Sequence, residues 1–247
     1  MNTYKLNRNF FIVLANLVLF FTINLHAQDV TLTSQNEVVA FGTSSDTSVA
    51  GSLVIDDTPS NQKITDLSPL LNLVSIGSDL VIITSELSNL DGLDSLSYVG
   101  NNLVLFNNSS LNDLAGLSSI DSIHGVLSIE GNPSLESMEG MSNLVSSEFM
   151  RIKNNATLSS LNGLSGLTSI PQILLIDNNP LLENLEGLSS LSSVGYLRIR
   201  NNEGLTSLEG MSGLTELSGP VVDPCSCSPF QSFIDVNNSL IDLSGLS

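Results

Sequence analysis

The sequence predicts a repeat solenoid of α/β type, in which successive coils of the chain stack on one another and share one parallel sheet. Three observations predict it. A short apolar pattern recurs along the 247-residue chain at intervals of 23 to 27 residues, each copy opens with alternating apolar residues, and an asparagine follows most of them. No single copy can bury its own apolar side, so the copies must stack to form a continuous core.

Residues 1–27 are predicted to be a secretory signal peptide that is not part of this core. Lys5 and Arg8 precede an apolar run over residues 10–25, and small Ala27 marks the cleavage site. A transmembrane anchor is the alternative, but a run of about 16 residues is shorter than the roughly 20 that span a bilayer. We therefore expect the protein to be secreted or displayed on the outer cell surface, with a mature chain that does not span the membrane.

The charge of the mature chain excludes some partners. Removing residues 1–27 leaves five bases against 25 acids, a net charge of −20. Such a chain repels nucleic acid and anionic membranes, so we expect neither as a partner.

Residues 28–50 are predicted to cap the first coil. Ser34 and Glu37 have the spacing of a capping box at the start of a short helix, and Gly42 is expected to end that helix. The helix would cover the apolar end of the stack, as capping elements of solenoids do. Its covering residues are expected to be Val38 and Phe41.

Residues 51–217 are predicted to form the coils themselves. Each copy begins with an L-x-I stretch, and this alternation is typical of a half-buried strand. Apolar residues then recur at every third position, which suits short helical turns or tight corners. After the first pair, the copies are 23 or 24 residues apart, a period typical of leucine-rich repeats, so we expect a right-handed stack with one strand per coil. The copies start at Leu53, Leu80, Leu103, Leu127, Met150, Leu174 and Leu197.

An asparagine ladder is predicted at the corner that follows each strand. The residue before each asparagine pair is variously Phe, Lys, Asp or Arg, and a metal site would not accept a base where another copy has an acid. Stacked asparagines can instead satisfy backbone groups at a turn. The expected ladder residues are Asn108, Asn132, Asn155, Asn179 and Asn202.

Residues 218–247 break the repeat and then resume it in an incomplete last coil, with Ile234 and Val236 expected at the two inward strand positions. Cys225 and Cys227 are expected to form a loop disulfide or to remain free thiols, because a zinc site needs more ligands. The open last coil favours either a fragment of a longer protein or self-association through that end.

The repeated L-x-x-L-x-G-L-x-x-L-x-x-I/V pattern, seen from residues 64–82 onward, resembles receptor L-domain repeats. These form the leucine-rich-like solenoid of the ligand-binding lobes of the insulin and epidermal growth factor receptors. The chain is also similar to secreted or surface repeat proteins of Bacteroidota-type bacteria, including the stretch LTSQNEVVAFG at residues 32–42. The resemblance covers about residues 31–217 and implies the same solenoid fold in a bacterial surface protein.

The outward strand positions form the candidate binding face, because four of the five mature bases lie there. One interpretation is a charge ladder, in which Glu130, Lys153, Asp177 and Arg200 alternate in sign on neighbouring strands and each pair contributes about 0.2–1 kcal/mol. The other is a face that binds a protein or a glycan through an apolar half and a basic half. Its candidate residues are Val81, Ile83, Val104, Phe106, Arg151, Lys153, Tyr196, Arg198 and Arg200.

These patterns favour a binding or adhesion module and not an enzyme. His124 is the single histidine of the mature chain, nothing places a nucleophile beside it, and phosphate-loop and zinc motifs are absent from the sequence. We expect no cofactor and no metal site, although the acidic column that includes Glu186 and Glu209 could bind calcium weakly. Two alternatives stay open: a structural spacer within a longer surface protein, and a polysaccharide-active enzyme with paired acids on the sheet face.

Overall fold

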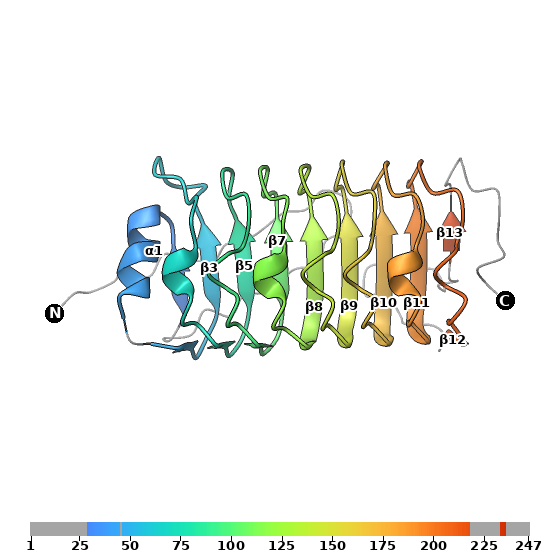
Figure 1. Ribbon diagram of the computed structural model, residues 1–247, viewed down its shortest axis with the longest axis horizontal. Helices are drawn as coiled ribbons and strands as arrows, with labels where there is room; N and C mark the ends of the chain where they lie inside the picture. The colour runs from blue at the N-terminus through green and yellow to red at the C-terminus, as the bar shows by residue number, and fades with distance from the viewer. Residues whose placement is uncertain (1–28, 45, 218–232, 236–247) are drawn as a thin grey trace, which may run out of the picture.

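The computed structural model describes residues 29–44, 46–217 and 233–235, and these residues form an elongated stack of about eight coils (Figure 1). The predicted signal peptide with Ala27, the two cysteines Cys225 and Cys227, and Val236 lie outside the described residues. No helix within the described ranges is long and apolar enough to cross a membrane.

Parallel strands from successive coils form the main sheet, which runs the length of the stack. The path through it is β1 (Val30–Leu32), β3 (Leu53–Asp56), β5 (Leu80–Ile83), β7 (Leu103–Phe106), β8 (Ser122–Glu130), β9 (Ser146–Lys153), β10 (Ser169–Asp177), β11 (Ser193–Arg200) and β12 (Glu216–Leu217), and β13 (Phe233–Asp235) also pairs with β11. The register aligns equivalent repeat positions, so that Leu53 lies opposite Leu80 and Leu80 opposite Leu103. The predicted parallel-sheet solenoid with coils of about 23 residues is confirmed.

A second, shorter strand precedes the main strand, which the prediction of one strand per coil missed. It appears as β2 (Ser48–Val49), β4 (Ser75–Ile76) and β6 (Tyr98–Val99), which pair with one another in parallel. From β8 onward this segment is continuous with the main strand, and a shift in register between Ile123 and Val126 separates the two parts. The apolar residue of the short strand points into the core, as the full burial of Ile76 shows.

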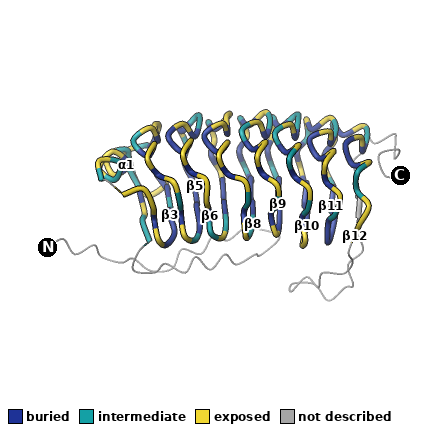
Figure 2. The backbone as a smooth tube through the Cα atoms, turned by 60° about the horizontal axis from the view of Figure 1, so that its bottom comes forward, coloured by how far each residue is buried: buried dark blue, intermediate teal, exposed yellow. Residues whose placement is uncertain are grey.

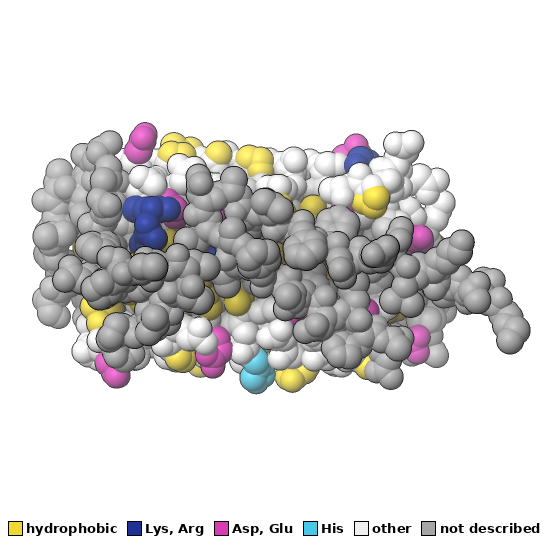
Figure 3. Space-filling view, turned by 180° about the vertical axis from the view of Figure 1, so that it is seen from behind, with side chains coloured by type: hydrophobic (Ala, Val, Ile, Leu, Met, Phe, Trp, Pro, Cys, Tyr) yellow, Lys and Arg dark blue, Asp and Glu magenta, His cyan; other side chains and the backbone are white. Residues whose placement is uncertain are grey.

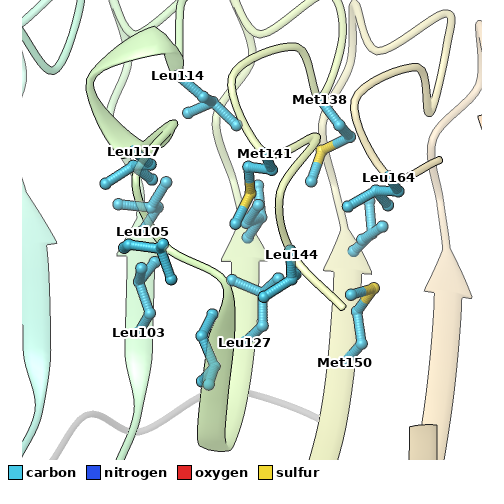
Figure 4. Packing of buried hydrophobic residues seen from close by; sticks show 14 of the residues in the cluster. Leu103, Leu105, Leu114, Leu117, Leu127, Met138, Met141, Leu144, Met150 and Leu164 are labelled. Atoms are coloured by element: carbon cyan, nitrogen blue, oxygen red, sulfur yellow. The ribbon is translucent and has the colours of Figure 1, made fainter. Parts of the chain in front are cut away.

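Leucine, isoleucine and methionine side chains fill the inside of the coils as one continuous core. Inward strand residues such as Leu103 and Leu105 are fully buried, and so are the third-position residues that follow them, such as Leu114. Figure 4 shows Met141 and Met150 among the leucines of neighbouring coils. Burying one such side chain stabilises the fold by about 1.5–3 kcal/mol, and each coil obtains this only from its neighbours.

The described residues contain few helices, and all of these are short. They are α1 (Gln35–Gly42), η1 (Ser68–Leu70), η2 (Ala115–Leu117) and η3 (Glu186–Leu188). The corners around them carry the exposed residues of each coil, whereas the strands are largely buried (Figure 2). Neighbouring corners approach so closely that a Cβ on Gly187 would lie 2.0 Å from the carbonyl oxygen of Leu161, which explains the glycine of the repeat.

The helix α1 lies at the N-terminal end of the stack, but its ends differ in detail from the sequence prediction (Figure 1). Ser34 is the N-cap, and its hydroxyl accepts a 3.4 Å hydrogen bond from the Glu37 N–H. The Glu37 carboxylate accepts from the N–H and hydroxyl of Thr33 and not from Ser34, so the expected capping box is displaced by one residue. Gly42 is the last residue of α1 and not a left-handed terminator; a Cβ there would lie 2.2 Å from the Pro69 carbonyl oxygen.

Both ends of the main sheet carry strands that the sequence did not predict correctly. The segment expected only as a cap also contributes β1, whose Val30 lies opposite Leu53. At the other end, Ile234 of β13 lies opposite Ile199, the second inward position of β11. The expected register, with Ile234 at the first inward position, is therefore wrong by two residues. The cause is that the sequence of residues 218–232 does not match the repeat, so the period cannot be counted across it.

Candidate functional site

The outer face of the main sheet carries a small apolar cluster that is separate from the core. It contains Val81, Ile83 and Val104, with Val54 and Phe106 packed against it, and we call these five residues the outer apolar cluster. They come from β3, β5 and β7, whose register places equivalent outward positions side by side. The residues predicted for the apolar half of the face thus pack together on these strands.

A set of charged residues continues the same face over the next strands. Glu130, Arg151, Lys153, Asp177 and Arg200 make up this outer charge cluster, on β8, β9, β10 and β11. Glu130 forms ion pairs with the Arg151 Nη1 at 3.6 Å and the Lys153 Nζ at 3.8 Å, and Asp177 pairs with the Arg200 Nη2 at 2.8 Å. The alternation of sign anticipated from the sequence thus produces cross-strand pairs at Glu130–Lys153 and Asp177–Arg200.

Arg151 is the least satisfied member of the outer charge cluster. Its residue is 2% exposed, and its guanidinium lies 5.5 Å from the centre of the Phe149 ring. The Nε and Nη2 atoms of Arg151 are buried without a hydrogen-bond partner, as are the Nε of Arg200 and the Oε2 of Glu130. Desolvation by burial lowers the pKa of Arg151, against the opposing effect of Glu130. An arginine nevertheless stays charged at neutral pH, so the side chain is a buried cation with two unused donors.

The candidate face is less open than alternating strand positions led us to expect. Val81, Ile83, Val104, Arg151 and Tyr196 are buried, whereas Phe106, Lys153, Arg198 and Arg200 are partly exposed. Arg198 lies on β11 opposite Leu175 of β10 and Phe233 of β13. Figure 3 views the molecule from behind, and dark-blue Lys and Arg side chains appear there towards both ends of the stack. The accessible candidate residues of the face are thus one aromatic side chain, Phe106, and three basic ones.

A pocket of about 270 Å³ lies at the carboxyl ends of β3, β5 and β7. The Asp56 Oδ1 accepts a 2.9 Å hydrogen bond from the Thr58 N–H, and the Asp57 Oδ2 accepts a 3.1 Å bond from the Ile64 N–H. The Lys63 Nζ lies 3.3 Å from the Asp57 Oδ1. The walls also include Ile83, Phe106 and Asn107. Sequence analysis missed this pocket; the one signal was an Asp-Asp pair at the strand end where later coils have asparagines.

The asparagines after the strands form a continuous hydrogen-bonded ladder in the interior of the corners. Each Oδ1 accepts from a backbone N–H one coil earlier. The Asn132 Oδ1 accepts from the Asn108 N–H at 3.0 Å, the Asn179 Oδ1 from the Asn155 N–H at 3.1 Å, and the Asn108 Oδ1 from the Thr84 N–H at 2.8 Å. Each Nδ2 donates to a strand carbonyl, as Asn108 does to Ile82 at 3.1 Å. The ladder residues, all fully buried, are Asn108, Asn132, Asn155, Asn179 and Asn202.

The first asparagine of each pair has a different role, which sequence analysis did not identify. Asn107, Asn154, Asn178 and Asn201 have φ values of 56–57°, in the left-handed region that asparagine tolerates better than most residues. Gly131, with φ at 72°, takes this place in the coil without a pair. The asparagine pairs therefore shape the corner after each strand and do not form a ligand site. In the described residues, no group of three or more His, Cys, Asp or Glu is placed to hold a metal ion.

The remaining chemistry-bearing residues, His124 on β8 and two glutamates of the acidic column, are exposed surface groups. His124 is exposed, and its ring lies 5.7 Å from that of Tyr98. Glu186 and Glu209, members of the acidic column, are exposed as well.

No protein-family model matches the chain, and neither the curated proteins nor the solved structures contain a match to it.

Proposed function

We propose that the protein is a non-enzymatic binding module, a right-handed leucine-rich solenoid of receptor L-domain type that is secreted or displayed at a bacterial cell surface. Its partner is a protein that presents an acidic side chain to the outer face of the sheet. The observation that carries this proposal is the unused edge of the Arg151 guanidinium.

The geometry of that edge favours a carboxylate. The Nε and Nη2 donors of an arginine lie on one side of the planar guanidinium, where they match the two oxygens of a carboxylate. In Arg151 these are the two nitrogens without a hydrogen-bond partner, whereas Nη1 faces Glu130. Both nitrogens are buried, so the Arg151 side chain must turn outward to meet a partner. Leaving the donors buried and unpaired costs about 1–3 kcal/mol for each, and a partner that supplies the acceptors recovers that cost.

The charge balance of the face agrees with an acidic partner. Arg151, Lys153 and Arg200 outnumber Glu130 and Asp177 in the outer charge cluster, and Arg198 adds a further base on β11. The whole chain has a net charge of −18, so this face differs in sign from its surroundings. A local patch of opposite sign steers an acidic group towards the face and disfavours other contacts.

The neighbouring apolar residues favour a protein over a glycan. Phe106 lies opposite Glu130 in the register, so the outer apolar cluster adjoins the outer charge cluster directly. Protein interfaces combine a buried apolar centre with arginine and aromatic anchors. A carboxylate beside an apolar side chain, as in an acidic peptide segment, matches both parts of the face.

The test is selection of peptides from a random displayed library on the immobilised protein. Peptides in which Asp or Glu stands beside apolar residues should be enriched. The Arg151→Gln variant, which keeps a polar side chain of similar length, should bind them at least ten-fold more weakly. The control Ser190→Glu makes the same change in net charge at an exposed corner and should bind normally. Equal binding by Arg151→Gln would exclude this site.

The runner-up is a structural spacer, which the ion pairs within the outer charge cluster favour because they already compensate most of its charge. Failure to enrich any peptide, together with no retention of acidic or neutral glycans, would support the spacer. If the immobilised protein retains glycans but enriches no peptide, the ligand is a sugar and not a protein. If it also releases reducing sugar from those glycans, the protein is an enzyme.

A further inference from the structure

We infer that the pocket at the carboxyl ends of β3, β5 and β7 is a second binding site, which takes an alkylammonium group against Asp56. This site lies on other strands than Arg151 and attracts the opposite charge, so it does not depend on the function proposed above.

Asp56 is a buried carboxylate that forms no ion pair within the described residues, although Lys63 lines the same pocket. The residue is 5% exposed, and none of the ion pairs among the described residues includes it. Its position in the next coils is taken by Ile83 and Phe106, whereas the equivalent Asp177 lies opposite Arg200. Burial of a carboxylate is costly unless a cation or several donors compensate it.

The hydrogen bonds of Asp56 leave one oxygen for a ligand. Its Oδ1 accepts from the Thr58 N–H at 2.9 Å. Within the part of the chain that the structure describes, its Oδ2 accepts no hydrogen bond, and Asp56 lines the pocket. An ammonium group, which has three donors and no acceptor, is suited to this oxygen.

The other charged groups of the pocket compensate each other. The Lys63 Nζ lies 3.3 Å from the Asp57 Oδ1 and donates to the Asp57 carbonyl oxygen at 3.2 Å. The second Asp57 oxygen accepts from the Ile64 N–H. This pair adds no net charge, so the pocket as a whole carries the single negative charge of Asp56.

The walls favour an organic cation over a metal ion. Ile83 is 8% exposed and Phe106 is half-buried, and both line the pocket next to Asp56. An aliphatic chain packs against such walls, and an ammonium group is attracted to an aromatic ring. Calcium takes six to eight oxygen ligands, more than one unpaired carboxylate supplies. A volume of about 270 Å³ is roughly nine times that of a water molecule in the liquid, enough for an amine of several carbons.

The first experiment is a titration followed through the Ile83 methyl resonances at about 0.15 M salt, where the diffuse attraction of the acidic chain for cations is screened. The probes are n-butylammonium chloride and, as its neutral counterpart, n-butanol. Butylammonium should give saturable shifts at Ile83, and butanol should bind at least ten-fold more weakly. Equal affinity for the two probes would overturn the inference.

Two variants complete the experiment. Asp56→Asn keeps an oxygen for the Thr58 N–H and removes the charge, so it should weaken butylammonium binding at least ten-fold. The control Asp91→Asn removes the same charge at an exposed corner and should leave binding unchanged. Unchanged binding by Asp56→Asn, or equal loss in both variants, would contradict the site. A second probe, Nα-acetyl-lysine amide, distinguishes the source: tighter binding than butylammonium indicates a lysine side chain of a protein, and weaker binding indicates a free amine.

Discussion

Arg151 Nη1 lies 3.6 Å from Glu130 Oε2 across two neighbouring strands, and both side chains are at least nine-tenths buried. The pair is shared, since Glu130 also faces Lys153. Breaking a buried ion pair by removing one partner leaves an uncompensated charge, whereas replacing both partners with apolar residues is often neutral.

We therefore expect Glu130→Gln to lower the free energy of unfolding by about 3 kcal/mol, because Arg151 loses its paired acid. The double variant Glu130→Leu/Arg151→Met should unfold within about 1 kcal/mol of the parent. Urea denaturation of the parent, Glu130→Gln, the single variants Glu130→Leu and Arg151→Met, and the double variant measures this. A double variant whose loss equals the sum of the two single losses would show that the residues do not act as a pair.

The two asparagines of one corner should differ sharply in their contribution to stability. Asn155→Ala removes the acceptor of the Asn132 N–H and the donor to the Ile129 carbonyl oxygen, both buried, and should cost about 3 kcal/mol. Asn154→Ala keeps the ladder and should cost about 1–2 kcal/mol through its positive φ.

Asn154→Gly is the matched control, because glycine adopts that conformation without strain. It loses only the side-chain hydrogen bonds with Glu130 and Asn178, and it should stay within about 1 kcal/mol of the parent. Thermal denaturation ranks the three variants. A loss for Asn154→Gly as large as that for Asn155→Ala would contradict the division of roles within the pair.

The destabilisation caused by replacing a repeat glycine with alanine should depend on how much space the neighbouring coil leaves for a Cβ. Gly187→Ala places a Cβ 2.0 Å from the Leu161 carbonyl oxygen, a backbone atom that cannot move aside, and should cost about 3 kcal/mol. Gly213→Ala meets its nearest atom, the Ser189 carbonyl oxygen, at 2.8 Å and should cost less. Equal melting temperatures for the two variants would show that the corners shift apart easily.

We expect α1 to cap the first coil, and this prediction can be tested locally. Val38 is fully buried, so Val38→Asp places a charge in the apolar end of the stack. Amide hydrogen exchange should then accelerate in β1 and β3 and remain slow in β10, because each coil contacts only its neighbours. The exposed control Val39→Asp should leave all three strands protected. Equal acceleration along the whole stack would mean that α1 is not a local cap.

The main features of the fold were predictable because every copy of the repeat independently indicates the same inward and outward positions. Leu53, Leu80 and Leu103 occupy one inward column, and a slip of one residue would turn every apolar side chain outward. The short strands were not predictable, since a two-residue segment such as Tyr98–Val99 has the same pattern as any corner with one apolar residue.

The candidate site was predictable only in part. The strand pattern placed Glu130 beside Lys153, but it contains no information on how far each side chain is buried or which nitrogen of Arg151 lacks a partner. The pocket depends on Lys63 returning to Asp57 from the following loop, and such a contact has no periodic signal.

The asparagine ladder also has a direction. Every Oδ1 in it points to the coil on its N-terminal side, since it accepts from that coil. The ladder ends at Thr84, whose N–H and hydroxyl donate to the Asn108 Oδ1 at 2.8 and 3.0 Å. The side-chain amide dipoles therefore add along the axis, with the negative end at Thr84, and aligned hydrogen bonds polarise one another. Thr84 lines the pocket together with Asp56. The aligned amide dipoles of the later coils therefore add a weak negative potential at this pocket, which attracts positive charge to that end of the molecule.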